Sequence, residues 1–503
     1  MAKNKKVNKM LASAEVVPIE SKSPQSVYPV PTEKLMALLN KQRLAHSAIP
    51  YPDYETRIKR LDRCIDLLVT HQDEICEAVN RDFGCRSAHV TRMSDLFVSL
   101  QSLKFTKKRL KQWMKVERRS APFPMNLIGA RSEIHYQPKG VIGIMTPWNV
   151  PVNPIFSQLA DVLAAGNRAM IKPSEFTPHT SELLEKLISE YFFDEEVVVI
   201  NGDAETGAAF SQLPFDHLIF TGSTAVGAKV MASAAANLTP VTLELGGKSP
   251  VIIADDYDLD DAADKLMVAK AMNAGQICIS PDFCFVPEAS LNVFVDKCRQ
   301  VVSKLYPTVQ DNPDFVSVIN ERHFDRINRY LDDAKSKGAQ VISLDPTQSE
   351  WAHTSGQKIP LHLVINPSED MLVMQEELFG PILCLRSYKA FDDCIADINN
   401  RPNPLALYLF SNSKAVQRKL INNTMAGAMT INDIAVHYAC DDLPFGGVGK
   451  SGMGQIHGWE GFKTFSHAKS VFKQGLLNLP KVSGMLPPYG DKFDKLSRGL
   501  VKK

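Results

Sequence analysis

The strongest constraint on the fold is an alternation of short apolar runs with longer helical segments between residues 140 and 245. The apolar runs lie at 141–145, 169–171, 197–200, 217–220 and 241–243, and the helical segments lie at 154–165, 178–192 and 224–236. Strands that alternate with helices pair in parallel, because each helix crosses back over the sheet. The pattern predicts an α/β fold whose binding residues follow the carboxyl ends of the strands.

A second alternation begins near Ser249 and predicts a second α/β domain. Its helices lie at 260–272 and 291–305, and its strands at 283–286 and 341–343. The link between the two series falls near Gly246 and Gly247, so residues on either side of this link face a common cleft.

The segments around the first alternation are simpler. Residues 31–114 are helical, with Ile58, Leu61, Ile65 and Leu68 at spacings of three and four. Residues 116–137 form an arm or hairpin with an extended strand at 131–136, because Pro122 and Pro124 end the helical pattern.

Composition excludes several classes of function. The net charge of +1 gives no global attraction to nucleic acid or to an anionic membrane. The nine cysteines contain no C-x-x-C pair, so we expect neither a metal site nor a redox pair. The basic start has no apolar segment of a secretory signal, and no apolar run reaches the roughly 18 residues of a membrane span. We therefore expect a cytoplasmic protein that neither enters membranes nor binds nucleic acid.

Two residues near the link carry groups for covalent chemistry. Cys278 supplies a thiol that can attack a carbonyl carbon, and Glu244 supplies a carboxylate that can act as general base. A single cysteine is more often a small buried apolar residue, and a glutamate before two glycines is more often solvated or capping. The pair gains weight only from the other motifs.

Three further motifs follow predicted strands. The turn at 220–227 contains Gly222, Ser223 and Gly227 and opens a helix, an arrangement that suits either a phosphate or a plain tight turn. Glu175 follows another strand and can bind ribose hydroxyls, or it and Ser174 can cap the next helix. Asn149 lies in a turn and can donate to a developing oxyanion, although turns favour Asn for backbone reasons as well.

Together these segments resemble the aldehyde dehydrogenase superfamily from about residue 40 to 470. Six motifs occur in the family's order, including the segment at 376–381 and the glycine-rich segment at 443–452, and Cys278 lies 34 positions after Glu244. The segments at 275–282, 449–454 and 464–467 look like the class 3 branch. Within that branch, the segments at 167–172 and 238–247 are similar to those of bacterial coniferyl aldehyde dehydrogenases.

The resemblance implies the fold of that superfamily: a Rossmann-like parallel-sheet cofactor domain, a second α/β catalytic domain and a small β oligomerisation arm. The implied parts are a flexible N-terminal extension (1–30), an NAD-binding domain (31–115 and 138–246), an oligomerisation arm (116–137 and 463–475), a catalytic domain (247–445) and an irregular C-terminal tail (476–503). By the same analogy the protein is a homodimer.

The resemblance also implies roles for single residues. Cys278 is the nucleophile, Asn149 holds the oxyanion, and Glu244 activates the hydrolytic water. The residues that resemble the family's cofactor contacts are Lys172, Glu175, Gly222, Ser223, Gly227, Glu377 and Phe379. The cofactor is NAD, because the Glu175 carboxylate repels a 2′-phosphate, although NADP remains open.

The implied reaction is oxidation of an aldehyde to its acid. The expected substrate is an aromatic aldehyde such as coniferaldehyde or a medium-chain aliphatic aldehyde. A semialdehyde substrate, acyl transfer to coenzyme A and a catalytically silent scaffold on the same fold remain alternatives, as does a plain cysteine hydrolase. Glu244 argues against the transfer to coenzyme A, and a hydrolase leaves the nucleotide motifs unexplained.

Overall fold

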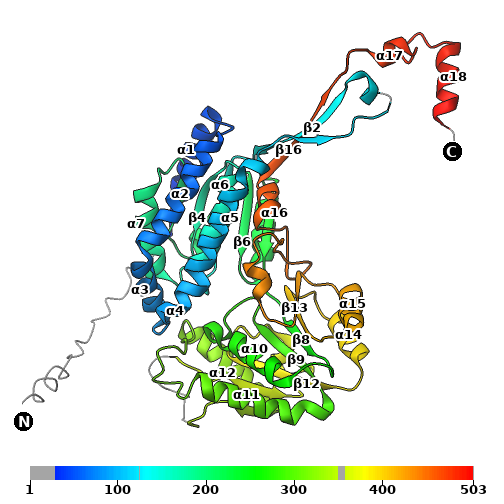
Figure 1. The fold of residues 1–503 in the computed structure, drawn as a ribbon. Coiled ribbons are helices and arrows are strands. Elements are labelled where there is room, and N and C mark those ends of the chain that lie inside the picture. Colours follow the sequence, from blue (N-terminus) through cyan, green and yellow to red (C-terminus); the bar gives the residue numbers. More distant parts are fainter. Residues whose placement is uncertain (1–28, 124, 349–356, 502–503) are drawn as a thin grey trace, which may run out of the picture.

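The computed structural model describes residues 29–123, 125–348 and 357–501 (Figure 1). The predicted N-terminal extension lies outside these ranges apart from its last two residues. The chain then forms a helical segment, as expected. Its helices are α1 (Thr32–Ala48), α2 (Tyr54–Thr70), α3 (Gln72–Phe83), α4 (Ala88–Thr91), the π-helix η1 (Arg92–Phe97) and α5 (Val98–Trp113). The predicted stripe is confirmed, since Leu61 and Leu68 are fully buried in the core.

The first alternation forms a six-stranded sheet in the order β15-β7-β6-β3-β4-β5. All neighbours pair in parallel except β15 with β7. The strands are β3 (Val141–Met145), β4 (Arg168–Lys172), β5 (Val197–Val199), β6 (His217–Thr221), β7 (Val241–Glu244) and β15 (Gly452–Met453). The helices between them are α6 (Asn153–Ala164), α7 (Pro178–Tyr191), α8 (Ala204–Ser211) and α9 (Thr224–Ala235). The strand order reverses between β3 and β6, which makes their carboxyl ends a crevice for a ligand.

The second alternation forms a seven-stranded sheet in the order β10-β11-β12-β9-β8-β13-β14. Its strands are β8 (Ser249–Ile253), β9 (Pro281–Pro287), β10 (Gln340–Ser343), β11 (His362–Ile365), β12 (Ile382–Tyr388), β13 (Ala406–Phe410) and β14 (Ala428–Ile431). The main helices here are α10 (Leu259–Ala271), α11 (Leu291–Leu305), α12 (Glu321–Ser336), α14 (Phe391–Asn399) and α15 (Lys414–Asn423). Short helices are η3 (Met272–Gly275), η4 (Glu288–Ser290), α13 (Leu372–Gln375) and η5 (Val436–Ala439).

A three-stranded antiparallel sheet forms the predicted arm. It contains β1 (Glu117–Arg119), β2 (Arg131–Pro138) and β16 (Ser466–Lys473), with the short helix η2 (Met125–Ile128) between the first two strands. Helix α16 (Gly458–Thr464) connects the arm to the six-stranded sheet, and Figure 1 shows the arm projecting away from both large sheets.

The expectation of an irregular tail over residues 476–503 is wrong. The tail contains the helices α17 (Leu479–Val482) and α18 (Asp491–Leu500), which lie beyond the far end of the arm (Figure 1). Charged residues at 491, 492, 494, 495 and 498 alternate with Phe493, Leu496 and Leu500, a helical spacing that the three prolines at 480, 487 and 488 obscured.

Over the described ranges, the structure has no helix both long and apolar enough to cross a lipid bilayer. The same residues contain no group of three His, Cys, Asp or Glu side chains placed to hold a metal ion.

Candidate active site

Asn149 lies in the turn after β3, and hydrogen bonds hold it on three sides. Its side-chain Nδ2 donates to the carbonyl oxygen of Gln276 at 3.0 Å. Its own carbonyl accepts from Arg86 Nη1 at 2.8 Å and from Asn273 Nδ2 at 2.9 Å. Because Nδ2 carries two hydrogens, one remains for a ligand next to the segment that leads to Cys278.

A tight turn before Cys278 sets the position of its thiol. Asn273 and Ala274 both adopt left-handed backbone angles, with φ of 51°, which is unusual for residues other than glycine. The Gln276 side chain holds the turn, since Nε2 donates to the Asn273 carbonyl at 2.9 Å and Oε1 accepts from Ile319 N at 3.1 Å. Such strain persists only where surrounding bonds determine it, and it is common at functional sites.

The Cys278 loop lies beside the segment that precedes β12. Gly275 has φ of +71°, and a Cβ atom there would overlap the carbonyl of Gly380. Strands β9 and β12 are neighbours, so the loops at their amino ends meet at one edge of the seven-stranded sheet. The close approach of these two glycines brings the Phe379 region to Cys278.

Glu244 ends β7 and is buried without a partner. Its side chain is 3% exposed, and neither carboxyl oxygen has a hydrogen-bond partner among the described residues. Burial raises the pKa of Glu244 well above its usual range. Burial therefore favours the protonated form of this carboxyl group and makes the ionised form a stronger base than an exposed carboxylate.

Cys278 is half-buried, and its thiol is desolvated. Burial first, and then the charges of Glu377 and Glu244, raise the pKa of the thiol to about 12. The influence of both carboxylates indicates that three of the predicted site residues lie in one electrostatic neighbourhood.

Glu377 reaches the same place from the second sheet. A Cβ atom on Gly246 would overlap the Glu377 carboxylate, so the carboxylate lies against the loop two residues after Glu244. The pKa of Glu377 is raised to about 7, mainly by burial and also by the charge of Asp282. A hydrogen bond from the backbone N–H of Gly247 opposes this increase.

The Glu377 segment is fixed by two basic side chains that sequence reasoning missed. Arg326 donates to the carbonyls of Leu378 at 2.7 Å and Phe379 at 3.0 Å. Lys248 forms a buried ion pair with Asp282, whose second oxygen accepts from the Leu378 N–H at 2.8 Å. The predicted residue Phe379 adopts φ of 41° and packs edge-on against Trp148, with ring centroids 5.4 Å apart.

The turn after β6 carries the predicted phosphate contacts. Ser223 caps α9, and Gly222 N donates to the Glu244 carbonyl at 3.0 Å. A Cβ atom on Gly227 would overlap the Leu245 side chain, so α9 packs closely on the sheet. The free N–H groups at the start of this helix therefore lie at the reversal of strand order, where a phosphate binds favourably.

Lys172 and Glu175 follow β4 on the same edge of the sheet. Lys172 is buried, its Nζ donates to the Pro173 carbonyl at 2.8 Å, and burial lowers its pKa. Glu175 is exposed. The capping alternative for Glu175 is wrong, because Thr177 is the cap position of α7 and the Asp82 carboxylate accepts from the first free N–H groups of that helix.

Two groups of predicted residues thus meet between the sheets. Asn149, Lys172, Gly222 and Glu244 follow the carboxyl ends of strands in the six-stranded sheet, and Cys278 and Glu377 precede strands of the seven-stranded sheet. Four side chains that position the site could not be found from the sequence: Arg86, Gln276, Lys248 and Arg326. Each forms a hydrogen bond to a residue at least 34 positions away, so no local sequence pattern indicates its role.

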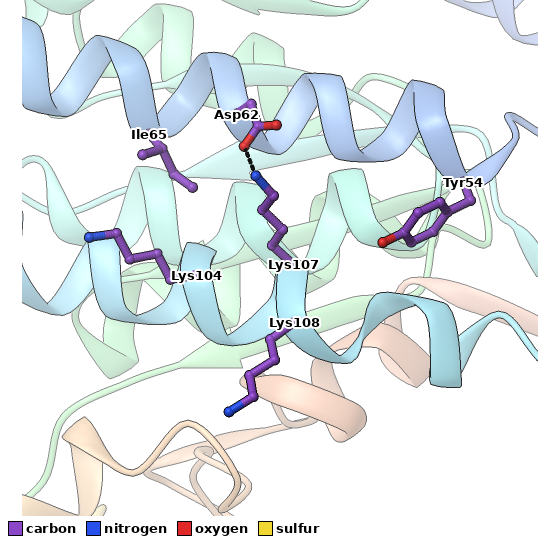
Figure 2. Close-up of a pocket in the computed structure, with 6 residues that line it drawn as sticks. All are labelled: Tyr54, Asp62, Ile65, Lys104, Lys107 and Lys108. Carbon is purple, nitrogen blue, oxygen red and sulfur yellow. Dashed lines mark hydrogen bonds and ion pairs between the residues drawn. The ribbon is translucent and has the colours of Figure 1, made fainter.

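A separate surface hollow lies between α2 and α5 (Figure 2). It is lined by Tyr54, Asp62, Ile65, Lys104, Lys107 and Lys108. Lys107 forms an ion pair with Asp62, while the other two lysines point away from that carboxylate. None of the predicted site residues lines this hollow.

Known proteins resemble this chain in sequence. The model of the family described as "Aldehyde dehydrogenase family" matches residues 15–471. The chain is 47% identical over 467 residues to the "Probable coniferyl aldehyde dehydrogenase" of Caulobacter vibrioides, covering 93% of this chain and 96% of that protein. It is 45% identical over 473 residues to the "Coniferyl aldehyde dehydrogenase" of Pseudomonas sp. strain HR199, with 94% and 97% covered.

A solved structure shows the same fold. The substrate-bound state of Staphylococcus aureus AldH superposes with a TM-score of 0.85 at 33% identity, over 93% of this chain and 99% of that one.

Proposed function

This chain belongs to the aldehyde dehydrogenase family, and we propose that it catalyses the NAD-dependent oxidation of an aromatic aldehyde, such as coniferaldehyde, to the carboxylic acid. The observation that carries the proposal is the shared electrostatic neighbourhood of Cys278, Glu244 and Glu377 between the two sheets. A thiol, a base and a nucleotide-binding sheet edge are the parts that this oxidation needs.

The covalent steps use residues of this chain. The Cys278 sulfur forms a bond to the aldehyde carbon, the carbonyl electron pair moves to oxygen, and the thiol proton passes to a base. The remaining hydrogen of Asn149 Nδ2 and the backbone N–H of Cys278 stabilise that oxyanion. Oxidation gives a thioester at Cys278. Glu244 then takes a proton from water, the water oxygen attacks the thioester, and the C–S bond breaks to regenerate the thiol.

The residues at the sheet edge suit a nicotinamide dinucleotide, which enzymes of this family use. Side chains at Gly222 and Gly227 would overlap Phe220 and Leu245, so the start of α9 packs closely on the sheet, and the N–H groups at a helix start favour a pyrophosphate. Exposed Glu175 can accept from a ribose 2′-hydroxyl and would repel a 2′-phosphate, which favours NAD over NADP. When bound, the nicotinamide supplies the two-electron acceptor for the oxidation.

All nine cysteines are free, with no disulfide between them. Free thiols suit a reducing compartment, so we place the enzyme in the cytoplasm.

The test is NADH formation by the purified protein with NAD and four aldehydes: coniferaldehyde, benzaldehyde, hexanal and succinate semialdehyde. Cys278→Ala is run beside the wild type, and Cys440→Ala, which removes an exposed thiol, is the matched control. We expect turnover, highest with the aromatic aldehydes, to disappear in Cys278→Ala alone. Absence of turnover by the wild type with every aldehyde would refute the proposal.

A further inference from the structure

Four aromatic rings pack together beside the site without a role in the chemistry described above. This cluster, named the aromatic–histidine cluster, contains His437, Tyr438, Phe445 and His457. The Tyr438 ring centroid lies 4.8 Å from that of Phe445 and 5.0 Å from that of His457. Phe445 stacks on both histidines, at 6.1 Å from His437 and 5.5 Å from His457.

Hydrogen bonds connect the cluster to both sides of the catalytic centre. The Tyr438 hydroxyl accepts from Asn153 Nδ2 at 3.0 Å, at the start of α6 and four residues after Asn149. On the other side, the Tyr408 hydroxyl donates to the carbonyl of Ile279, the residue after Cys278, at 2.6 Å, and the Tyr408 ring lies 6.2 Å from that of His437. The cluster therefore lies beside the turn that holds Asn149 and the loop that holds Cys278.

Tyr438 also senses the catalytic charges. Burial raises its pKa, and the charges of Cys278 and Glu244 raise it further. The Tyr438 residue nevertheless keeps accessible surface, as do Cys278 and Glu377. The charge of Cys278 acts on Tyr438, so Tyr438 and the thiol lie in one electrostatic neighbourhood.

His457 is buried with unused hydrogen-bonding capacity. Its side chain is 3% exposed, and neither Nδ1 nor Nε2 has a hydrogen-bond partner among the described residues. Its backbone has φ of +75°, and its N–H donates to the buried Asp161 carboxyl at 3.0 Å. A buried polar ring without a partner is unfavourable, and strain of this kind is kept at sites that bind ligands.

The chemistry of the cluster selects the group that His457 can bind. Burial, and to a smaller extent the neighbouring His437, lower the pKa of His457 to about 4. The ring is therefore neutral, with one donor and one acceptor nitrogen. The acidic residues nearby are Asp161, which bonds the His457 backbone, and Asp441, whose charge raises the pKa of Asp161. The neutral ring offers no charge that would attract a carboxylate or a cation. A hydroxyl group, in contrast, can donate a hydrogen bond to one ring nitrogen or accept one from the other.

We propose that His457 is a specificity-determining residue that hydrogen-bonds the hydroxyl group at the far end of an aromatic aldehyde, whose ring lies against Tyr438. This inference rests on the proposed aldehyde oxidation and adds the feature of the substrate that is recognised. A site built to bond a substrate hydroxyl discriminates against an analogue without it, because the buried polar group then lacks its partner.

The test compares kcat/KM for 4-hydroxycinnamaldehyde and cinnamaldehyde, which differ by that hydroxyl alone. We expect the wild type to prefer the hydroxylated aldehyde by about tenfold, the value of roughly one hydrogen bond to a buried group. His457→Phe keeps the ring shape but removes both nitrogens, so the ratio should fall to about one. His457→Asn keeps a donor and an acceptor and should retain part of the preference.

The matched control is His217→Phe. His217 is also buried and neutral, but its ring already bonds Thr242 Oγ1 at 2.8 Å and Lys139 Nζ at 3.0 Å, so this variant should keep the wild-type ratio. Circular dichroism and thermal melting check the fold of each variant.

A folded His457→Phe with the wild-type ratio, or a wild type that does not discriminate, would overturn the role of His457. Failure of the wild type to oxidise any aldehyde would instead overturn the reaction itself, so the two failures are distinguishable.

Discussion

Burial favours the protonated form of two reactive side chains of the site. Glu244 has no cation or donor near its carboxyl oxygens among the described residues, and burial alone raises its pKa. Cys278 is desolvated and lies near carboxylates, which oppose ionisation of the thiol. The site is therefore arranged to supply strong bases and nucleophiles in small equilibrium amounts, and pH controls those amounts.

The reactivity of Cys278 should rise steeply with pH. Because the pKa of the thiol is raised to about 12, the thiolate fraction increases about tenfold per pH unit over the whole range below it. We expect the rate constant for modification by iodoacetamide to rise with a logarithmic slope near one from pH 6 to 9. The measurement is made in Cys440→Ala, which lacks the exposed thiol, and a plateau below pH 8 would contradict the expected environment.

Glu244→Gln separates the two half-reactions. The amide cannot accept a proton from water, so hydrolysis of the thioester should become the slow step while thioester formation continues. We expect a pre-steady-state burst of NADH that approaches one equivalent per site, followed by slow turnover. Equal slowing of both phases, without a burst, would assign Glu244 to activation of the thiol instead.

Asn149→Ala removes one oxyanion donor without removing a charge. Loss of such a donor costs about 10²–10³ in kcat, whereas the proposed nucleotide contacts after β4 and β6 are unchanged. We expect that decrease in kcat with an unchanged Kd for NAD, measured by fluorescence titration. Wild-type kcat in a folded Asn149→Ala protein would remove this residue from the mechanism.

Among the secondary-structure elements, the turn between β3 and α6 depends on a helix distant in the sequence. Arg86 and Asp95 form a fully buried ion pair at 2.6 Å. Arg86 bonds the Asn149 carbonyl, and Asp95 accepts from the N–H groups of Val152 and Asn153 at the start of α6. Asp95 lies in the π-helix η1, an irregularity that is frequent at functional sites.

Asp95→Asn should loosen this turn and destabilise the protein. Removing one charge of a buried pair leaves the other uncompensated, which typically costs about 3–5 kcal/mol. We expect a clear drop in Tm by calorimetry together with lower kcat. The control is Arg92→Met, which breaks the exposed ion pair with Asp73 and should cost less than about 1 kcal/mol. An equal decrease in Tm in both variants would show that the buried ion pair of Asp95 stabilises the protein no more than the exposed ion pair of Arg92.

In the whole molecule, the arm projects away from both large sheets (Figure 1) and exposes apolar side chains. Its sheet has β1 and β16 at its edges, and the large apolar residues Phe123, Leu127 and Phe472 are more than half exposed. An exposed strand edge pairs readily with another chain. This arrangement supports the proposal that the arm joins two copies of the protein.

Sedimentation equilibrium tests that proposal. We expect the full chain to sediment with twice the mass of one chain. Removal of residues 476–503 deletes only the helices beyond the arm and should leave the dimer intact, whereas removal of residues 466–503 also deletes the edge strand β16 and should yield monomers. A full chain that sediments as a single copy at micromolar concentration would contradict the arm as a dimer contact.

The sequence by itself determined the two alternations and therefore the strands that carry the site. Asn149, Glu175 and Gly222 were singled out because each follows its own strand, and in a parallel sheet the carboxyl ends share one edge. The role of Lys172 came from the family resemblance. The tail was misjudged because its prolines obscured a short amphipathic pattern. For these elements the physical information is local, a few residues of periodicity and a turn.

The tertiary structure alone decided how that edge meets the second sheet. Three contacts join residues between 63 and 296 positions apart in the sequence. They are the contact of Glu377 with Gly246, the hydrogen bond from Arg86 to Asn149 and the hydrogen bond from the His457 N–H to Asp161. Such contacts depend on the order of strands in a sheet and on which side chains burial leaves without water. Neither property is encoded in a local pattern, because each arises from packing of the whole chain.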